Sequence, residues 1–262
     1  MGRLRGDMSE YSKQLEANLQ RIQGGVHEAC EKANRRPDEI KIVAVTKYAT
    51  LDVVKDIVDL GLSELGESKA QELAARGEAI HEFLSTRARD MQAGAMPRPK
   101  WHMVGHLQRN KVRLVLPWVE MIHSVDSLRL GEEISAEAVN RDCEVDVLMQ
   151  VNSSNEASKF GVAVGAATHL AEMIATLPNV NLCGLMTMAP LTDDRDAIYD
   201  CFMRCRELYD EITHEVEVGE HFRHLSMGMS RDFDIAIGCG ATILRIGSAL
   251  TEGLPTTAPA TT

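Results

Sequence analysis

The chain has 262 residues, a length at which an α/β barrel forms one domain. Apolar residues make up 44% and charged residues 26%, which is typical of a globular protein whose core needs no disulfide or structural metal. The net charge of -11 argues against a nucleic-acid binder, because phosphate backbones attract basic surfaces. A few local donors can still bind a small phosphate group.

Short apolar runs alternate with amphipathic stretches along the chain. Residues 9–34 show the three- and four-residue apolar spacing of a helix. Residues 42–45 are apolar without alternation, which favours a strand buried on both faces, as in a parallel sheet. The predicted strands are 40–45, 63–66, 101–104, 119–123, 145–151, 180–186, 222–226 and 242–246. The helices between them begin at about residue 51 (ending before Gly61) and cover 68–84, 110–116, 128–139, 164–177, 194–214 and 232–237.

Strict alternation of strands and helices predicts a parallel sheet, and about eight such units predict a closed barrel. We therefore expect a single (β/α)8 TIM-type barrel with an extra N-terminal helix, formed by residues 1–253. An open doubly wound sheet is the alternative, but the turn at 46–50 lacks the glycines of a dinucleotide fingerprint. Glycine and prolines in 85–99 predict a surface insertion, and the Pro-, Thr- and Ala-rich residues 254–262 predict a disordered tail.

No apolar run reaches membrane-spanning length, and the N-terminus lacks the apolar segment of a signal peptide. The six cysteines are scattered without the C-x-x-C spacing of a zinc site, which suits a reducing cytoplasm. His102 and His106 have no carboxylate at metal-motif spacing beside them, so we predict no metal site. We expect a cytoplasmic protein, monomeric and in contact with neither membrane nor nucleic acid.

In a barrel of this kind, functional residues gather at the C-terminal ends of the strands. Lys47 directly follows the first predicted strand. An unpaired ammonium is costly to bury, and burial favours the neutral amine, which can condense with an aldehyde. The alternative is a lysine that reaches solvent or pairs with Glu67.

Two segments that follow the last two predicted strands fit a phosphate group. Ser226, Gly228 and Ser230 offer hydroxyls and an unhindered backbone before a short predicted helix, whose N-terminus suits a dianion. Gly247 and Ser248 offer a second close backbone approach, at the loops where barrels often bind phosphate. Small residues that merely form tight turns are the alternative. Together with a reactive amine, these segments describe a phosphate-bearing aldehyde as the ligand.

Arg245 lies two residues before Gly247 in the last predicted strand, so both residues point to the same face. If that face is the barrel interior, Arg245 is a buried permanent cation that needs an acceptor. A pyridine nitrogen is such an acceptor, and the pairing would discourage protonation of that nitrogen. Pairing with Glu67 or Asp126 is the structural alternative.

Seven motifs, in order, carry a resemblance that covers residues 9–253. They are IVAVTKYA (42–49), GESKAQE (66–72), WHMVGHLQRNK (101–111), HSVD (123–126), QVNSSNEASKFG (150–161), GLMTMAP (184–190) and LSMGMSRDFDIAIGCGATILRIGSAL (225–250). The ordered set resembles the pyridoxal phosphate homeostasis proteins, which are relatives of the alanine racemase barrel domain.

The resemblance implies pyridoxal 5'-phosphate (PLP), held as an internal aldimine on Lys47. It implies phosphate binding by residues 226–230 together with Gly247 and Ser248, and it places Arg245 against the pyridine nitrogen. The family carries or buffers the cofactor without an established catalytic activity of its own. The implied recipients are the apo forms of PLP-dependent enzymes.

Two positions depart from the family pattern: Ser68 stands where asparagine is usual, and Tyr48 follows Lys47 where Thr-Lys-Pro is commoner. Neither departure touches the implied aldimine, and both concern the details of cofactor release or transfer. Two enzyme functions stay open. An amino-acid racemase needs acid/base groups on both faces of its substrate, whereas Tyr48 should point away from Lys47 along a strand. An aldolase-type barrel would use Lys47 on its substrate and hold no bound chromophore.

Overall fold

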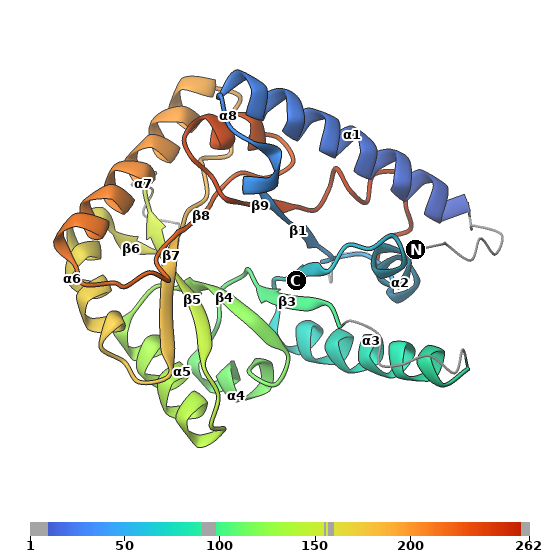
Figure 1. Cartoon of the computed structure of the whole chain (residues 1–262), viewed down its shortest axis with the longest axis horizontal. Helices are drawn as coiled ribbons and strands as arrows, with labels where there is room; N and C mark the ends of the chain where they lie inside the picture. Colours follow the sequence, from blue (N-terminus) through green and yellow to red (C-terminus); the bar gives the residue numbers. More distant parts are fainter. Residues whose placement is uncertain (1–9, 91–97, 155, 157–159, 258–262) are drawn as a thin grey trace.

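A computed structural model of the chain describes residues 10–90, 98–154, 156 and 160–257. Within these residues, eight parallel strands close into a barrel whose outside is covered by helices (Figure 1). The order around the barrel is β1-β2-β3-β4-β5-β7-β8-β9, with β9 paired again to β1. The predicted TIM-type fold, with one helix before the first strand, is confirmed.

Every predicted strand and helix has a counterpart in the structure. The barrel strands are β1 (Lys41–Val45), β2 (Glu64–Glu67), β3 (Lys100–Met103), β4 (Val119–Val125), β5 (Val145–Asn152), β7 (Val180–Met186), β8 (His224–Ser226) and β9 (Ile243–Ile246). The helices are α1 (Glu10–Lys32), α2 (Leu51–Asp59), α3 (Ala70–Asp90), α4 (Val112–Val115), α5 (Leu128–Asn140), α6 (Val164–Ala175), α7 (Arg195–Glu215) and α8 (Phe233–Gly238), with 3-10 turns η1 (Pro37–Glu39) and η2 (Arg109–Lys111). One short strand that was not predicted, β6 (Val162–Ala163), pairs with the end of β5.

Helix α1 takes the outer position that a helix after β9 would fill in a regular (β/α)8 barrel. It packs against both α8 and α2 (Figure 1). Its apolar face, formed by Leu15, Leu19, Ile22 and Val26, is buried against the barrel. The described residues after β9 form no helix, so the extra N-terminal helix completes the outer ring.

Two segments differ from the predictions. Helix α3 continues to Asp90, so residues 85–90 belong to a helix rather than to the predicted insertion 85–99. The basic side chains of Arg87 and Arg89 lie in the last turn of α3, where cations stabilise a helix. Residues 91–97 lie outside the described residues.

The tail is the second difference. Leu254 is buried, and Thr256 forms an antiparallel bridge with Ala49. The amide of Thr257 donates to the carbonyl of Tyr48 at 2.6 Å. Residues 254–257 therefore have defined partners, and residues 258–262 lie outside the described residues.

Strand residues alternate between the barrel interior and the surrounding helices. One apolar cluster separate from the main core contains Val43, Val45, Val104, Met121, Leu148, Cys183, Met186 and Ile243. These residues point inward, whereas their strand neighbours such as Ala44 and Leu244 pack against the helices. Polar residues share the inward positions, and Arg245 and His123 are both buried there.

Several features are absent from the part of the chain that the structure describes. None of its helices is both long and apolar enough to cross a membrane. It contains no group of three or more His, Cys, Asp or Glu side chains placed to hold a metal ion. All six cysteines are free thiols.

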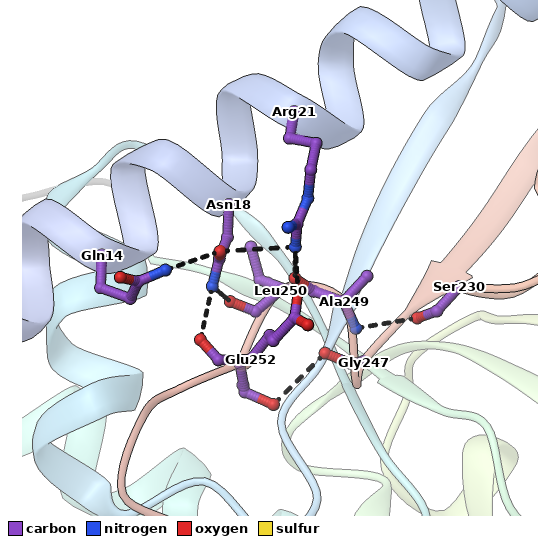
Figure 2. A network of polar contacts seen from close by, with 9 residues as sticks. Gln14, Asn18, Arg21, Ser230, Gly247, Ala249, Leu250 and Glu252 are labelled. Carbon is purple, nitrogen blue, oxygen red and sulfur yellow. Dashed lines mark hydrogen bonds and ion pairs between the residues drawn. The ribbon is translucent and has the colours of Figure 1, made fainter.

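A network of polar contacts joins α1 to the segment after β9 (Figure 2). Asn18 is buried, and its amide donates to the carbonyls of Leu250 and Glu252 at 3.0 and 2.9 Å. Arg21 forms an ion pair with the Glu252 side chain. The Asn18 oxygen accepts in turn from Gln14 at 3.0 Å. Helix α1 therefore fixes the loop that follows the last strand.

We expect Asn18→Ala to lower the free energy of unfolding by about 1–3 kcal/mol, because the change leaves one buried and one partly buried carbonyl without their donor. Urea unfolding of both proteins measures the difference. Gln20→Ala is the matched control, since Gln20 is exposed on the same helix, and it should change stability by less than about 0.5 kcal/mol. Equal losses in the two variants would contradict the assignment.

Candidate functional site at the mouth of the barrel

A cleft of about 970 Å³ lies at the C-terminal ends of the barrel strands. It is lined by residues that follow β1, β2, β3, β7, β8 and β9, and among them are Lys47, Ser68, His106, Ser230, Arg245 and Ser248. The volume suits a small organic ligand, and the position is the one where barrels of this kind bind ligands. Five of the seven predicted site residues line the cleft, while Ser226 and Gly228 do not.

Lys47 lies in a tight turn rather than at the end of an extended strand. The amide of Ala49 donates to the carbonyl of Thr46 at 2.9 Å, and Tyr48 has a φ of 69°. These features are typical of a type II turn. Lys47 is exposed within the cleft, so the predicted burial of its amine is wrong.

Tyr48 also lines the cleft, contrary to the prediction that it points away from Lys47. The Lys47 Nζ lies 5.8 Å from the centroid of the Tyr48 ring. The turn thus presents an amine and a phenol side by side. Ser68, the other departure from the family pattern, is likewise in the cleft wall.

Arg76 of α3 stabilises the turn that carries Lys47. Arg76 donates to the carbonyls of Thr46 and Ala49 at 2.8 and 2.7 Å, and it lies 3.2 Å from Glu67 Oε1. The Thr46 hydroxyl donates to the same carboxylate oxygen at 2.5 Å. Glu67, proposed above as an alternative partner of Lys47, therefore pairs with Arg76 and Thr46 instead.

Burial raises the pKa of Glu67, although the Arg76 guanidinium and the Thr46 hydroxyl act in the opposite direction. Glu67 is fully buried, and its Oε2 has no hydrogen-bond partner among the described residues. Sequence reasoning missed Arg76, because nothing in a helical sequence marks an arginine that reaches back to an earlier turn.

The two predicted phosphate segments meet at the cleft. The Ser230 hydroxyl accepts from the amide of Ala249 at 3.1 Å and so joins the segment after β8 to the segment after β9 (Figure 2). The backbone amides of Ser230, Arg231, Gly247 and Ser248 have no hydrogen-bond partner within the described ranges. Free amides that converge from two loops are suited to an anion.

Ser226 and Gly228 make contacts inside the protein and do not line the cleft. Ser226 is fully buried, and its hydroxyl lies 2.9 Å from His123 Nδ1 and accepts from Arg245 at 2.7 Å. Gly228 has a φ of 92°, and a Cβ there would lie 2.6 Å from the Ala236 Cβ. The position of Ser226 gives no support to the prediction that its hydroxyl binds phosphate, and Gly228 allows a close approach to α8.

Arg245 is a buried cation at the floor of the cleft, 4% exposed. It donates from NH1 to the carbonyl of Ser226 at 2.7 Å and from NH2 to the carbonyl of Thr187 at 2.9 Å. Burial lowers the pKa of Arg245 to about 10, so the side chain is still charged at neutral pH. The alternative pairing with Glu67 or Asp126 is wrong, because Asp126 faces His106 instead.

His106 and Phe160 close one side of the cleft. Their rings stack at 4.3 Å between centroids, and His106 Nδ1 lies 3.5 Å from Asp126 Oδ2. The sequence analysis weighed His106 only as a metal ligand, and it did not single out Phe160. A single aromatic residue in a loop has no pattern that would mark it.

The comparisons with known proteins identify the family of the chain. The family described as "Alanine racemase, N-terminal domain" matches residues 13–255. The chain is 36% identical over 232 residues to a pyridoxal phosphate homeostasis protein of Aquifex aeolicus, covering 88% of this chain and 95% of the relative. It is 34% identical to the protein of the same name from Pseudomonas aeruginosa, with 89% and 93% covered.

Solved structures show the same likeness. A Bifidobacterium adolescentis protein described as unknown superposes with a TM-score of 0.84 at 32% identity, covering 95% of this chain and 98% of that one. PipY of Synechococcus elongatus with PLP bound gives 0.70 at 25% identity, covering 86% and 99%.

The match over residues 13–255 spans nearly the whole chain, so the chain belongs to the family of the alanine racemase N-terminal domain. Within it, the chain belongs to the pyridoxal phosphate homeostasis proteins. The resemblance seen in the sequence is thereby confirmed.

The raised pKa of Glu67 predicts a pH dependence of stability. A carboxyl group with a raised pKa binds more protons folded than unfolded, so its contribution to stability falls as pH rises above the unfolded pKa of about 4.3. Glu67→Gln removes this loss and keeps an oxygen that accepts from Thr46 and Arg76. We expect the stability of the variant relative to the native chain to rise as the pH increases above about 4.3, as measured by urea unfolding over a range of pH values.

The control for this series is Glu82→Gln, an exposed position on the same helix as Arg76. Its difference from the native chain should stay constant across the range. A constant difference for Glu67→Gln as well would show that the buried carboxyl takes up no proton in that range.

Proposed function

We propose that the chain binds PLP in the cleft and carries or buffers this cofactor for apo PLP-dependent enzymes. The observation that carries the proposal is the convergence of three kinds of group on one cleft: the exposed Lys47 amine, the free amides of two loops and the Arg245 guanidinium. A pyridine that bears an aldehyde and a phosphate needs these three partners. PLP supplies an aldehyde that a lysine amine can bond covalently.

Each group has a separate task in this proposal. Lys47 holds the cofactor covalently, while Ser230, Gly247 and Ser248 bind its phosphate. Arg245 donates to the ring nitrogen, which keeps that nitrogen unprotonated and weakens the ring as an electron sink. A site built this way favours storage of the cofactor over catalysis.

The names of similar proteins support the proposal. PipY was solved with PLP bound, and several curated relatives are named for PLP homeostasis. The proposal also keeps the other expectations from the sequence: a cytoplasmic monomer without nucleic-acid or membrane partners, and, from the resemblance, apoenzymes as recipients.

A racemase-like function is the second candidate, and the position of Tyr48 in the cleft favours it. Lys47 and Tyr48 stand next to each other on one turn, however, whereas racemisation needs groups on opposite faces of a substrate. Incubation of the PLP-loaded chain with single-enantiomer amino acids separates the two functions. Racemisation well above that of free PLP would favour the second.

The first test is covalent labelling of the lysine. PLP added to the purified chain should give a visible absorption band, and borohydride should then fix the cofactor to the peptide that contains Lys47. Lys47→Ala should abolish both signals, because no other amine projects from the same turn. Lys55→Ala is the control, since Lys55 lies on α2 and does not line the cleft.

Label on Lys47 with full signals in the control supports the proposal. Absence of any band with the native chain, or label spread over surface lysines, would refute it and leave an anion-binding barrel of another substrate.

A further inference from the structure

A line of buried polar side chains crosses the barrel interior from Glu64 to Arg245. Glu64 Oε2 lies 2.7 Å from His102 Nε2, and His102 Nδ1 lies 2.9 Å from His123 Nε2. His123 Nδ1 lies 2.9 Å from Ser226 Oγ, which accepts from Arg245 NH1 at 2.7 Å. The functions proposed above use only the last of these five residues.

The line spans the barrel from wall to wall. Glu64, His102 and His123 come from the neighbouring strands β2, β3 and β4, whereas Ser226 and Arg245 come from β8 and β9. His102, His123 and Ser226 are fully buried, and only Glu64 is partly exposed, at 17% of its side chain. Glu64 begins β2 and therefore lies at the opposite end of the barrel from the cleft.

The chemistry of the two ends fixes the direction of every hydrogen bond. A guanidinium only donates, and an ionised carboxylate only accepts. Arg245 donates to Ser226, so the Ser226 O–H is free to donate to His123 Nδ1. His123 then donates from Nε2 to His102 Nδ1, and His102 donates from Nε2 to Glu64. Each middle group gives one proton and accepts one, with both imidazoles neutral.

A second proton on either imidazole is incompatible with these hydrogen-bond directions. If His102 or His123 were doubly protonated, His123 Nδ1 would carry a hydrogen and donate to Ser226. The Ser226 O–H would then have no acceptor among the described residues, and a buried unpaired donor costs about 1–3 kcal/mol. Both imidazoles are therefore held in the neutral form with hydrogen on Nε2.

The electrostatic surroundings agree. Burial lowers the pKa of His102 against the pull of Glu64, and Lys41 lowers it further while Glu120 raises it slightly. Burial lowers the pKa of His123 well below its usual value, helped by the neighbouring His102, Arg245, His224 and Lys41.

Glu64, at the accepting end of the line, differs from the two histidines because its partners outweigh the effect of burial on its pKa. Burial would raise the pKa of Glu64, but the hydrogen bond from His102 and the charges of Lys41 and Lys100 outweigh it and lower the pKa. The carboxylate therefore stays ionised at neutral pH and can only accept.

We propose that His102 and His123 are positioning residues, which act through Ser226 to hold the Arg245 guanidinium at the floor of the cleft. A carboxylate in direct contact would neutralise Arg245 locally and compete for its donors. In this arrangement the Arg245 Nε–H and one NH2 hydrogen have no partner among the described residues. They stay available to a ligand; that the ligand is a pyridine ring rests on the proposed function.

The first measurement uses the native chain without PLP. In a protein with ¹⁵N-labelled histidine, the two buried imidazoles should both show the tautomer with hydrogen on Nε2. A scalar coupling between His123 Nε2 and His102 Nδ1 should reveal the N–H···N bond. Hydrogen on Nδ1 of either ring, or a doubly protonated ring at neutral pH, would contradict the proposed direction of the hydrogen bonds.

The second measurement breaks the link to Arg245. Ser226→Ala should weaken PLP binding by about tenfold or more, comparable to the loss of one charge-assisted hydrogen bond, and should shift the visible absorption of the bound cofactor. Ser124→Ala is the matched control, because Ser124 is equally buried and its hydroxyl has no partner among the described residues. It should leave both quantities within about twofold.

The outcomes separate the two proposals. Equal affinity and spectra for Ser226→Ala and the native chain would overturn the positioning role, while label on Lys47 would still uphold PLP binding. The tautomers need neither a variant nor PLP, so they test the hydrogen-bond chain even if Ser226→Ala fails to fold or the chain fails to bind PLP.

Discussion

A guanidinium buried inside a barrel must find hydrogen-bond acceptors without leaving the ligand-binding end, and Arg245 meets this constraint in an unusual way. Its donors go to the carbonyls of Thr187 and Ser226 and to one hydroxyl. A buried charge without compensation is strongly destabilising, and the charge of Asp232 adds to what these acceptors supply, since it favours the protonated form of Arg245. Ser226 is in turn held by His123, so polar side chains share the barrel interior with an apolar cluster.

The fold was predictable where local pattern and tertiary burial agree. Residues 43–45 of the apolar run 42–45 are buried on both faces of a parallel strand, as the composition of the run indicates, and Ile42 is partly buried. The predicted end of α3 was too early. The prolines Pro97 and Pro99 led us to assign all of 85–99 to an insertion, but they lie beyond Asp90, where the helix ends. The bridge between Ala49 and Thr256 had no signal at all, since it joins residues far apart in the sequence by two backbone groups.

The site was predictable only as far as strand ends reveal it. Lys47 follows from its place after β1, and Gly247 and Ser248 from theirs after β9. The exposure of Lys47 and the orientation of Tyr48 depend on a turn with positive φ at a residue other than glycine, which sequence does not mark. The pairing of His102 with His123 spans 21 residues and depends on the register of β3 against β4, so neither histidine alone indicates it.

The place of α1 in the outer ring has a consequence for the order of the chain. In a regular (β/α)8 barrel the last helix follows the last strand, whereas here the helix in that place comes first. Among the described residues, the outer ring is therefore interrupted between β9 and the helix that lies beside it, and this cut in the backbone falls where a regular barrel continues. Asn18 and Arg21 reconnect the two sides of this cut through Leu250 and Glu252 (Figure 2). Side-chain contacts here do what the peptide backbone does in an uncut barrel.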